Sequence, residues 1–268
     1  MDKKILISTG VSSREWILPY YLKHIYNLDY DKKLINIYWI VNNSNDKSLS
    51  ILHDFRKKYE NEYNSIIVEI YNNSDNPAES RADDIRDEYM YGWLSIIRNK
   101  ILKKCISLKC DFLFSCDSDI LVRPDTLKIS LSHNKHIVAS LLYNGYLHEG
   151  IENAYKYPNI LKEISPRNYT HIINNRVKFP EKQSPEKLIE CDFTGACVLI
   201  SQEACKHTKY EYHRQGEDEP FSYYLRQAGF YIFCVPFLFQ KHCMSEAVLN
   251  YFIQNKLVEE IKSESRRK

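Results

Sequence analysis

The stretch DFLFSCDSDILV, from Asp111 to Val122, decides the fold that this chain is expected to adopt. An apolar run ends in two carboxylates two residues apart, Asp117 and Asp119, and the chain then becomes apolar again. Side chains two apart on an extended chain project to the same side, so both carboxylates are expected at the edge of a buried strand. Two like charges that close oppose each other's ionisation, and a shared proton or a bound cation relieves the repulsion.

The cation best suited to such a pair is a hard divalent ion. Mg²⁺ and Mn²⁺ prefer one or two carboxylates together with substrate phosphates. The working hypothesis is therefore a metal site, formed by Asp117 and Asp119, that holds a diphosphate. The alternative is a solvated loop just past a strand, because Asp-x-Asp also occurs by chance.

Size and composition narrow the class of protein. The chain has 268 residues, enough for one large α/β domain or two small ones, and its net charge of +2 does not favour nucleic acid as a partner. It has only 7 glycines and neither G-x-G-x-x-G nor G-x-x-x-x-G-K. A metal and side chains would therefore do most of the work of neutralising a diphosphate.

The sequence also favours a cytoplasmic location. Residues 1–7 lead directly into a strand, and neither a signal peptide nor an apolar run long enough to span a bilayer is recognised. The 8 cysteines form no C-x-x-C pair, and most lie in apolar runs, which is typical of a reducing compartment. The basic tail, 266–268, is expected to be solvated, although it would also favour anionic lipid.

The first half of the chain alternates strands and helices. Strands are expected at 4–9, 34–41, 65–71 and in the acidic stretch. The helices between them begin near Pro19, span 48–59, and, for the third, carry apolar residues at helical spacing: Ile85, Tyr89, Trp93, Ile96, Ile97 and Ile101. Such alternation predicts a Rossmann-like α/β domain with a mainly parallel central sheet flanked by helices. Ligands of such sheets bind beyond the carboxyl ends of the strands, where Asp117 is expected to lie.

The second half of the chain lacks this regular alternation of strands and helices. Strands are expected at 137–143, 193–200 and 231–235, and the long segment 144–190 is expected to be irregular and to act as a lid or binding segment. Residues 216–220 open a helix that Gly229 ends. Ser245 caps a final amphipathic helix, whose apolar face is expected to comprise Leu249, Ile253, Leu257 and Ile261.

Taken in order, four segments resemble glycosyltransferases of the GT-A fold, nearest the family 2 type. They are IVNNSND at 40–46, IRNK at 97–100, the Asp-x-Asp motif DSD at 117–119, and FTGA at 193–196 followed by GED at 216–218 and YLRQAGF at 224–230. The resemblance implies one GT-A domain over 1–245, with a nucleotide-sugar donor half at 1–143 and an acceptor half at 144–245. Residues 246–268 would form the C-terminal helix and tail.

The resemblance further implies a nucleotide-diphospho-sugar donor, Mn²⁺ or Mg²⁺ as cofactor, and displacement with inversion (EC 2.4). Asp119 would ligate the metal, Asp117 the metal or the ribose, and His242 the metal or the diphosphate. Asp218 would be the general base, with Glu217 as a fallback. The resemblance also places donor contacts on the following residues: Thr9, Gly10, Arg14, Asn42, Arg98, Asp117 and Ser118.

The donor is expected to be a UDP-sugar, with one departure from the family pattern. Asn42 stands where many members have an aspartate that accepts a hydrogen bond from uracil. An amide can accept with its carbonyl, so uridine stays compatible with this residue. The sugar, the nucleobase and the acceptor, which would be a glycan, a lipid-linked sugar or a glycosylated protein, are left open, and so is retention of configuration.

The chemistry independently supports these roles. A metal that neutralises the leaving diphosphate lowers the barrier by several kcal/mol, and a carboxylate base contributes about 10²–10⁴-fold. A base distant in sequence from the metal site suits attack from the opposite side of the sugar. The helix that begins near Asp218 is expected to lower the pKa of this carboxyl, so that it is ionised at neutral pH.

Each residue also has a purely structural alternative. Asp218 would cap its helix, with Glu217 and Glu219 as substitute bases. His242 would be a surface or hydrogen-bonded histidine, Arg98 a buried ion-pair residue, and 42–46 only a turn. A group of tyrosines would either stack on an acceptor sugar or, for most of them, pack the long segment on the core. These are Tyr143, Tyr146, Tyr155, Tyr157 and Tyr169.

Two other functions compete with this interpretation. A sugar-1-phosphate nucleotidyltransferase would need a glycine-rich loop after the first strand, but residues 8–14 contain a single glycine. A carbohydrate-binding protein of the same fold would lack turnover, and the loss of Asp117, Asp119 or Asp218 would favour it, yet all three are present.

Overall fold

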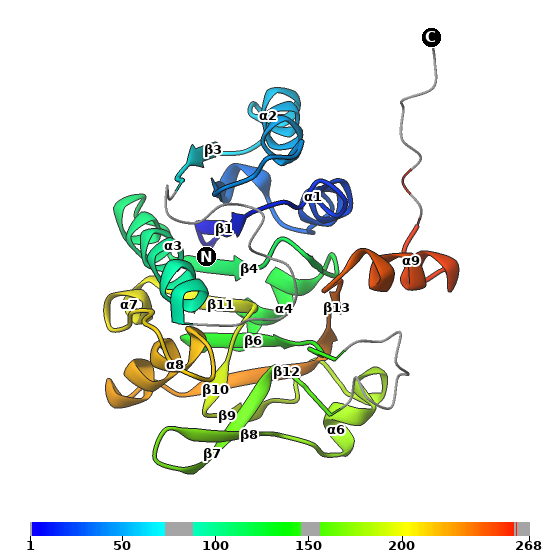
Figure 1. Ribbon diagram of the computed structural model, residues 1–268. Coiled ribbons are helices and arrows are strands. Elements are labelled where there is room, and N and C mark those ends of the chain that lie inside the picture. The colour runs from blue at the N-terminus through cyan, green and yellow to red at the C-terminus, as the bar shows by residue number, and fades with distance from the viewer. Residues whose placement is uncertain (1, 73–87, 146–155, 260, 262–268) are drawn as a thin grey trace.

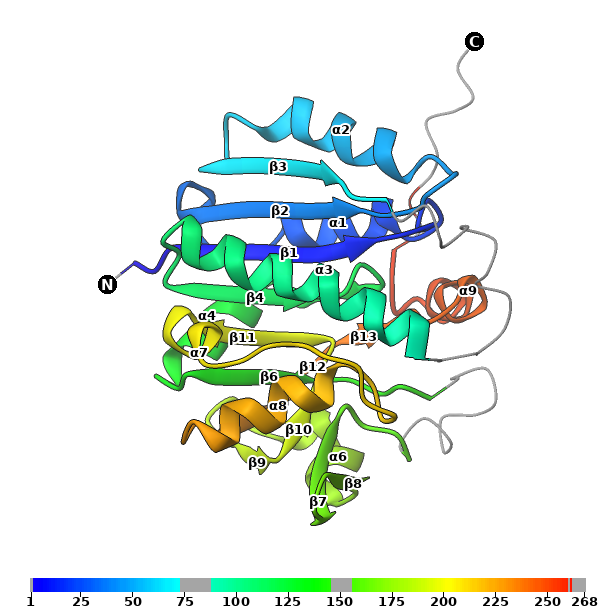
Figure 2. The same cartoon turned by 60° about the vertical axis from the view of Figure 1, so that its left-hand side comes forward.

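The computed structural model of the chain describes residues 2–72, 88–145, 156–259 and 261 (Figure 1). Its centre is an eight-stranded mixed, mainly parallel sheet of order β3-β2-β1-β4-β11-β6-β12-β9, seen strand by strand in Figure 2. These strands are β1 (Ile5–Val11), β2 (Ile35–Val41), β3 (Ser65–Ile70), β4 (Phe112–Cys116), β6 (Ile137–Leu141), β9 (Ile189–Cys191), β11 (Cys197–Ser201) and β12 (Ile232–Phe239).

Two small sheets accompany the large one. The first has the order β10-β7-β8, and the second pairs β13 with β5. Their strands are β5 (Ile120–Leu121), β7 (Ile160–Ser165), β8 (Asn168–His171), β10 (Phe193–Thr194) and β13 (Lys241–His242). The α-helices are α1 (Leu18–Tyr26), α2 (Ser48–Tyr59), α3 (Glu88–Ser107), α4 (Thr126–Ser132), α6 (Asn175–Lys178), α7 (Gln202–Lys206), α8 (Asp218–Gln227) and α9 (Glu246–Gln254), with 3₁₀ turns η1 (Lys32–Leu34) and η4 (Pro180–Lys182).

The predicted alternation of the first half is confirmed. Strands β3, β2, β1 and β4 are neighbours and run parallel, with helices α1, α2 and α3 between them in sequence. Pro19 occupies the first turn of α1, as its fixed φ and missing N–H favour. Four successive strands therefore direct their carboxyl ends to the same edge.

The sheet has a hydrophobic core on each face. In β1, Ile5 and Ile7 face one side and Leu6 the other, and all three are fully buried, because successive strand residues point to opposite faces. Figure 2 shows α3, α7 and α8 on the near face, with α1 and α4 behind the sheet. The near core includes Ile97 and Ile101 of α3. The large sheet is therefore packed on both faces.

One predicted strand is broken in two. Residues 193–200 form β10 and β11, which belong to different sheets. The break lies at Gly195-Ala196, where Ala196 has φ +69° and the N–H of Cys197 donates to the carbonyl of Gly195 at 2.8 Å. β11 runs antiparallel between β4 and β6, which explains why the large sheet is mixed.

The predicted irregular character of 144–190 is wrong for its second part. Within the described residues from 156 onward, the segment contains the hairpin β7-β8, helix α6 and strand β9. Other short elements, among them β5, α4, α7 and β13, are also absent from the sequence-based expectations. The reason is their length: each is seven residues or shorter and too short for a periodic signal.

The C-terminal helix is shorter than predicted. Ser245 caps α9, since its Oγ accepts from the N–H of Val248, and Leu249 is buried. The helix ends at Gln254, however, so Leu257 lies beyond it and is 51% exposed. Of the predicted third-helix residues, Ile85 lies outside the described residues, as do residues 73–81 of the preceding polar loop and the side chain of Tyr89.

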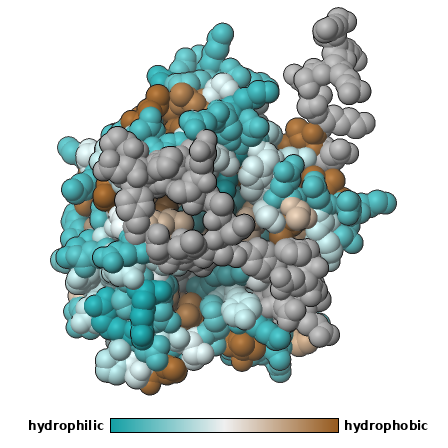
Figure 3. Space-filling model, viewed as in Figure 1, coloured by the Kyte–Doolittle hydropathy of each residue, from teal (hydrophilic) through white to brown (hydrophobic). Residues whose placement is uncertain are grey.

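The described surface on the face of Figure 3 is mostly hydrophilic, with hydrophobic side chains in small separate patches. Such scattered apolar residues are normal for a globular protein and need no partner to explain them. None of the helices in the described part of the chain has both the length and the hydrophobicity needed to cross a membrane.

Candidate active site

A cleft of about 440 Å³ opens at the carboxyl edge of the large sheet. It collects all but one of the residues that the sequence singled out for a catalytic, donor-binding or metal-binding role, the exception being the substitute base Glu219. These are Thr9, Gly10, Arg14, Asn42, Arg98, Asp117, Ser118, Asp119, Glu217, Asp218 and His242. They come from β1 and the loop after it, the end of β2, α3, the turn after β4, the start of α8 and β13, which are far apart in sequence. The fold therefore brings the predicted site residues into one cavity.

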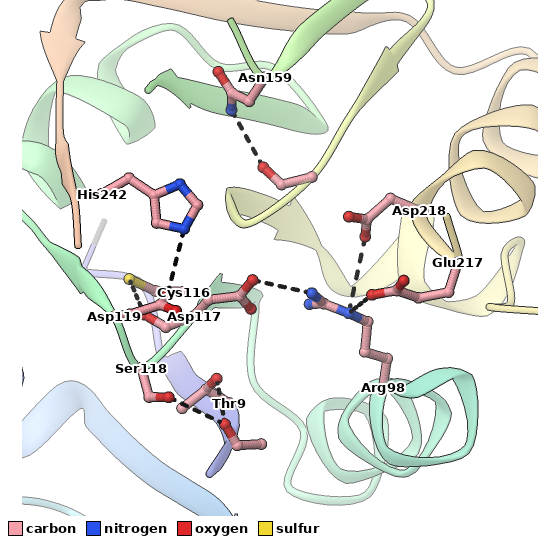
Figure 4. Close-up of polar contacts among 12 residues, drawn as sticks. Thr9, Arg98, Cys116, Asp117, Ser118, Asp119, Asn159, Glu217, Asp218 and His242 are labelled. Carbon is pink, nitrogen blue, oxygen red and sulfur yellow. Dashed lines mark hydrogen bonds and ion pairs between the residues drawn. The ribbon is translucent and has the colours of Figure 1, made fainter. Parts of the chain in front are cut away.

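Asp117 and Asp119 lie in a turn and not, as predicted, on an extended strand. Strand β4 ends at Cys116, and the N–H of Ile120 donates to the carbonyl of Asp117 at 3.0 Å, which closes the turn. The two carboxylates therefore diverge: Figure 4 shows Asp117 directed at Arg98, and Asp119 beside His242. Both nevertheless line the cleft.

An arginine neutralises each aspartate. Nη2 of Arg98 donates to Oδ2 of Asp117 at 3.1 Å, and Nη2 of Arg14 donates to Oδ2 of Asp119 at 3.0 Å. The segment after β2 positions Arg14. The N–H of Ser13 donates to Oγ of Ser44, in the turn at 42–46, at 2.9 Å, and the N–H of Arg14 donates to Oγ of Ser48 at the start of α2. The expected turn thus has a structural role next to the site.

The two carboxyl groups differ in their pKa. Burial raises the pKa of Asp117; the charge of Arg98 opposes this and the neighbouring Asp119 adds to it, so the pKa lies above its usual value. Burial also acts on Asp119, but Arg14 and His242 outweigh it and hold the pKa of that carboxyl well below its usual range. Asp119 is therefore ionised at every working pH.

The surroundings of Asp119 fit a divalent metal ion. Its Oδ1 lies 3.6 Å from Nε2 of His242, and this buried oxygen has no hydrogen-bond partner among the described residues. A carboxylate oxygen and an imidazole nitrogen are both acceptable ligands for Mn²⁺. In the same part of the chain, no three His, Cys, Asp or Glu side chains are grouped to hold an ion. A metal at Asp119 would need further ligands, as sites that use substrate phosphates do.

Arg98 joins the aspartate turn to the start of α8. Its Nε donates to Oε1 of Glu217 at 2.8 Å and lies 3.9 Å from Oδ1 of Asp218, while Nη2 binds Asp117. The guanidinium also lies over the ring of Tyr210, 5.6 Å from the centroid. These contacts are those of a buried ion-pair residue, which was the structural alternative predicted for Arg98.

Asp218 is the first residue of α8 and lies against the backbone of Gly195. A Cβ added to Gly195 would come within 1.9 Å of Oδ2 of Asp218, so only glycine leaves room for this carboxyl. The residue before the helix is Glu217, and neither it nor Asp218 makes a side-chain cap. The predicted alternative, a purely capping Asp218, does not describe this geometry.

The predicted low pKa of Asp218 is wrong. Burial raises the pKa of Asp218 to about 8; Arg98 opposes this, and the carboxylates of Glu217 and Asp117 add to it. The positive end of a helix is worth about 0.3–1 kcal/mol at an exposed site, which cannot offset removal of a carboxylate from water beside two others. The carboxyl thus carries its proton at neutral pH.

The two substitute bases have partners of their own. Glu217 is buried and bound to Arg98, while Glu219 is fully buried, receives two hydrogen bonds from Arg167 and does not line the cleft. Because a base must reach the acceptor hydroxyl, Glu219 is excluded and Asp218 is the better placed of the remaining two.

The donor-side residues pack closely at the ends of β1 and β2. Thr9 and Ser118 both direct their hydroxyls to the carbonyl of Gly10, at 3.1 and 3.4 Å. A Cβ on Gly10 would lie 3.0 Å from Cγ2 of Ile97, so glycine lets α3 approach the strand. Asn42 is buried, and its backbone N–H donates to the carbonyl of Val11.

Most of the predicted tyrosines do not face the cleft. Tyr143 and Tyr169 are buried in the body of the protein, Tyr157 is exposed away from the cleft lining, and Tyr146 and Tyr155 lie outside the described residues. For the first two, packing is the observed role.

Several cleft residues were not predicted from the sequence. Asn159 donates to the carbonyl of Gly195 at 3.2 Å and so supports the turn beside Asp218 (Figure 4). The remaining unpredicted lining includes Tyr91, Gln215 and Phe193. A single glycine inside the predicted strand 193–200 was the available signal, because such a glycine marks close approach of another group. The other residues carry no signal, since their place depends on the path of the loops.

The comparisons with known proteins agree with the fold. The mannosyltransferase PcManGT from Pyrobaculum calidifontis, solved with GDP-Man and Mn²⁺, is 10% identical with a TM-score of 0.57, over 95% of this chain and 61% of that one. GalNAc-T7, solved with UDP, GalNAc and Mn²⁺, is 16% identical with a TM-score of 0.57, over 90% and 44%. These likenesses establish the GT-A fold.

Sequence comparison gives two further matches. The family model described as Anp1 matches residues 1–174. A curated protein of Aedes aegypti, "Glycosyltransferase 25 family member", is 23% identical over 146 residues, which is 54% of this chain and 24% of that protein. The chain therefore spans about a quarter of the length of this relative.

Proposed function

The chain belongs to the Anp1 family, and from this premise we propose that it is a metal-dependent glycosyltransferase. It would move a sugar from a nucleotide-diphospho-sugar to an acceptor hydroxyl. The observation that carries the proposal is the meeting, in one cleft, of the aspartate turn at the sheet edge with a separate carboxyl, Asp218, which only a glycine accommodates. Placement in family 2 and the UDP-sugar stay predictions from the sequence.

On the donor side, Asp119 and His242 would hold the metal, with Asp117 beside them. Support comes from the buried Oδ1 of Asp119, which lacks a hydrogen-bond partner among the described residues, and from the two structural neighbours, which were solved with Mn²⁺ and either GDP-Man or UDP. When bound, the metal supplies positive charge to the leaving diphosphate. The carboxyl ends of β1, β2 and β4 would hold the nucleotide through Thr9 and Asn42.

On the acceptor side, Asp218 would take the proton of the attacking hydroxyl. The new bond joins the acceptor oxygen to the anomeric carbon, the bond from that carbon to the diphosphate oxygen breaks, and direct displacement inverts the configuration. Glu217 is less suited because Arg98 binds its carboxylate at 2.8 Å. The pKa of Asp218, about 8, is close to the working pH, which is the condition that favours general-base catalysis.

The test is a panel of nucleotide-sugars, including GDP-mannose, UDP-GlcNAc and UDP-GalNAc, assayed with Mn²⁺ for released nucleotide. The wild type should turn over at least one donor, and simple methyl glycosides offered as acceptors should raise that rate. Asp119→Ala should lose metal-dependent donor binding, whereas Asp218→Asn should keep binding and lose transfer. Full activity in Asp218→Asn would remove the proposed base, and nucleotide binding without turnover would indicate a binding protein.

A further inference from the structure

Helix α8 presents a polar stripe to the small sheet β10-β7-β8, buried at Glu219 and Ser222 and partly buried at Arg226. Ser222 and Arg226 lie three and seven residues after Glu219, so the three side chains share one face of the helix. Arg226 donates from Nη1 to Oε2 of Glu163 in β7 at 2.6 Å, and Ser222 donates to the carbonyl of Thr194 in β10 at 3.4 Å. The helix is therefore docked through polar contacts from its first turn to its last.

Glu219 is the centre of this stripe. Its side chain is 0% exposed and receives a two-pronged interaction from Arg167, Nε to Oε1 at 3.0 Å and Nη2 to Oε2 at 2.6 Å. The hydroxyl of Tyr169 donates to the same Oε1 at 3.1 Å. Two parallel N–H···O bonds define the plane of a carboxylate as well as its distance, so Glu219 has one orientation.

The cluster closes on itself through the hairpin. Nη2 of Arg226 donates to the Tyr169 hydroxyl at 2.7 Å, and the backbone N–H of Arg167 donates to Oε1 of Glu163 at 2.7 Å. Arg167 lies at the hairpin turn with φ +55°. Each charged group thus has a partner on the other element, which joins the first and last turns of α8 to the β7-β8 hairpin.

Stability alone does not explain such an arrangement. Burying a carboxylate with an arginine costs desolvation, and well-packed apolar residues often stabilise a protein equally well. What apolar packing does not provide is a fixed orientation. The residue whose orientation matters is adjacent: Asp218 precedes Glu219, and its carboxyl lies against Gly195, 3.9 Å from Nε of Arg98.

We propose that Glu219, held by Arg167 and Tyr169, is a positioning residue that fixes the start of α8 and thereby the carboxyl of Asp218. The inference rests on the proposed function for its catalytic meaning. Leu161 and Phe193, in the same small sheet, line the cleft. Tyr169 packs edge-to-face on Phe193, with ring centroids 5.4 Å apart. One cluster therefore aligns the base with the wall beside it.

The test compares Glu219→Gln and Arg167→Lys with Glu190→Gln, an exposed carboxylate in β9 of the same half of the chain. Three quantities are measured: hydrogen exchange of the backbone N–H groups within 216–221, where Pro220 has none, and kcat and KM for the donor that the wild type uses. We expect faster exchange at 216–221 in both cluster variants, unchanged exchange in β1, a fall in kcat of about 10²-fold from misplacement of the base, and an unchanged donor KM. Glu190→Gln should match the wild type.

A milder variant keeps the inference testable if Glu219→Gln fails to fold. Tyr169→Phe removes only the hydroxyl that bridges Glu219 and Arg226, and we expect the same exchange pattern with a fall in kcat of about tenfold. Unchanged exchange at 216–221, or parallel losses in kcat and donor binding, would overturn the inference. If the wild type turns over no nucleotide-sugar, the proposed function fails, and the exchange measurement alone decides the positioning role.

Discussion

Nε of Arg98 lies 2.8 Å from Oε1 of Glu217 but 3.9 Å from Oδ1 of the adjacent Asp218. Consecutive carboxylates at the start of one helix are thus divided between two tasks. Glu217 neutralises the arginine that also binds Asp117, and Asp218 keeps its carboxyl against the backbone of Gly195. The guanidinium of Arg98 thus connects Asp117, in the aspartate turn, with the helix start that carries the proposed base.

This division predicts unequal effects of two isosteric substitutions. Asp218→Asn should lower kcat by about 10²–10⁴-fold, the usual contribution of a general base, and leave nucleotide binding intact. Glu217→Gln should mainly lower stability, by about 1.5–3 kcal/mol for a lost charged hydrogen bond, since Asp117 still binds Arg98. Steady-state kinetics and chemical denaturation would measure both; a larger kcat loss in Glu217→Gln would reverse the assignment.

The raised pKa of Asp218 predicts how activity depends on pH. The group has a pKa of about 8 and must be ionised to accept a proton, so kcat/KM should rise with pH and level off above about 8. The profile of Asp218→Asn should lack this rise. A wild-type profile already flat from pH 6 would contradict the assignment of Asp218 as the titrating base.

The raised pKa of Asp218 also predicts how the free energy of unfolding changes with pH. Between the ordinary carboxyl pKa near 3.8 and about 8, the folded protein holds a proton at Asp218 that the unfolded chain has lost. Stability from this group is therefore lost as pH rises through that window. The melting temperature of Asp218→Asn, relative to the wild type, should be higher at pH 8 than at pH 5. An equal difference at both pH values would contradict this.

Gly195 is expected to be indispensable for activity. Its missing side chain leaves space that Oδ2 of Asp218 occupies, and an alanine Cβ would come within 1.9 Å of that oxygen. Gly195→Ala should turn the carboxyl away and lower kcat by about 10²-fold, while the protein still folds. Gly92→Ala is the matched control, because nothing lies within 4 Å of its added Cβ, and it should stabilise α3 by about 0.5–1 kcal/mol with unchanged activity.

The sequence was sufficient for the residues whose role follows from strand order. Asn42 and Asp117 follow parallel strands, so alternation of strands and helices was enough to place them at one edge. The direction of their side chains was not predictable, because the turn at 117–119 depends on β5 pairing with β13. A two-residue strand has no periodic signal in the sequence.

The pKa of Asp218 and the role of Glu219 lay beyond the sequence for a different reason. Both depend on residues that pack against the start of α8 from distant parts of the sequence, namely Gly195, Arg167 and Arg98. The local signal, an acidic helix start, predicted a lowered pKa, and long-range burial reversed it. The docked polar stripe of α8 was not predicted from the sequence.

Asp119 should control the response of the protein to Mn²⁺. Its Oδ1 is buried, faces His242 and lacks a hydrogen-bond partner among the described residues, and Arg14 helps to keep the carboxyl ionised. A ligand present at 100 times its Kd stabilises the folded state by about 2.7 kcal/mol, so Mn²⁺ added to GDP or UDP should raise the melting temperature of the wild type. EDTA should reverse the rise.

Asp119→Asn should abolish the part of this rise that depends on Mn²⁺, because an amide oxygen carries no charge to hold the ion. His242→Ala should reduce it. Asp125→Asn is the control: this aspartate is also near the aspartate turn in sequence, but it pairs with Arg123 outside the cleft lining. A full Mn²⁺ response in Asp119→Asn, measured by the same melting curves, would exclude Asp119 as a ligand and leave the aspartate turn without its proposed metal.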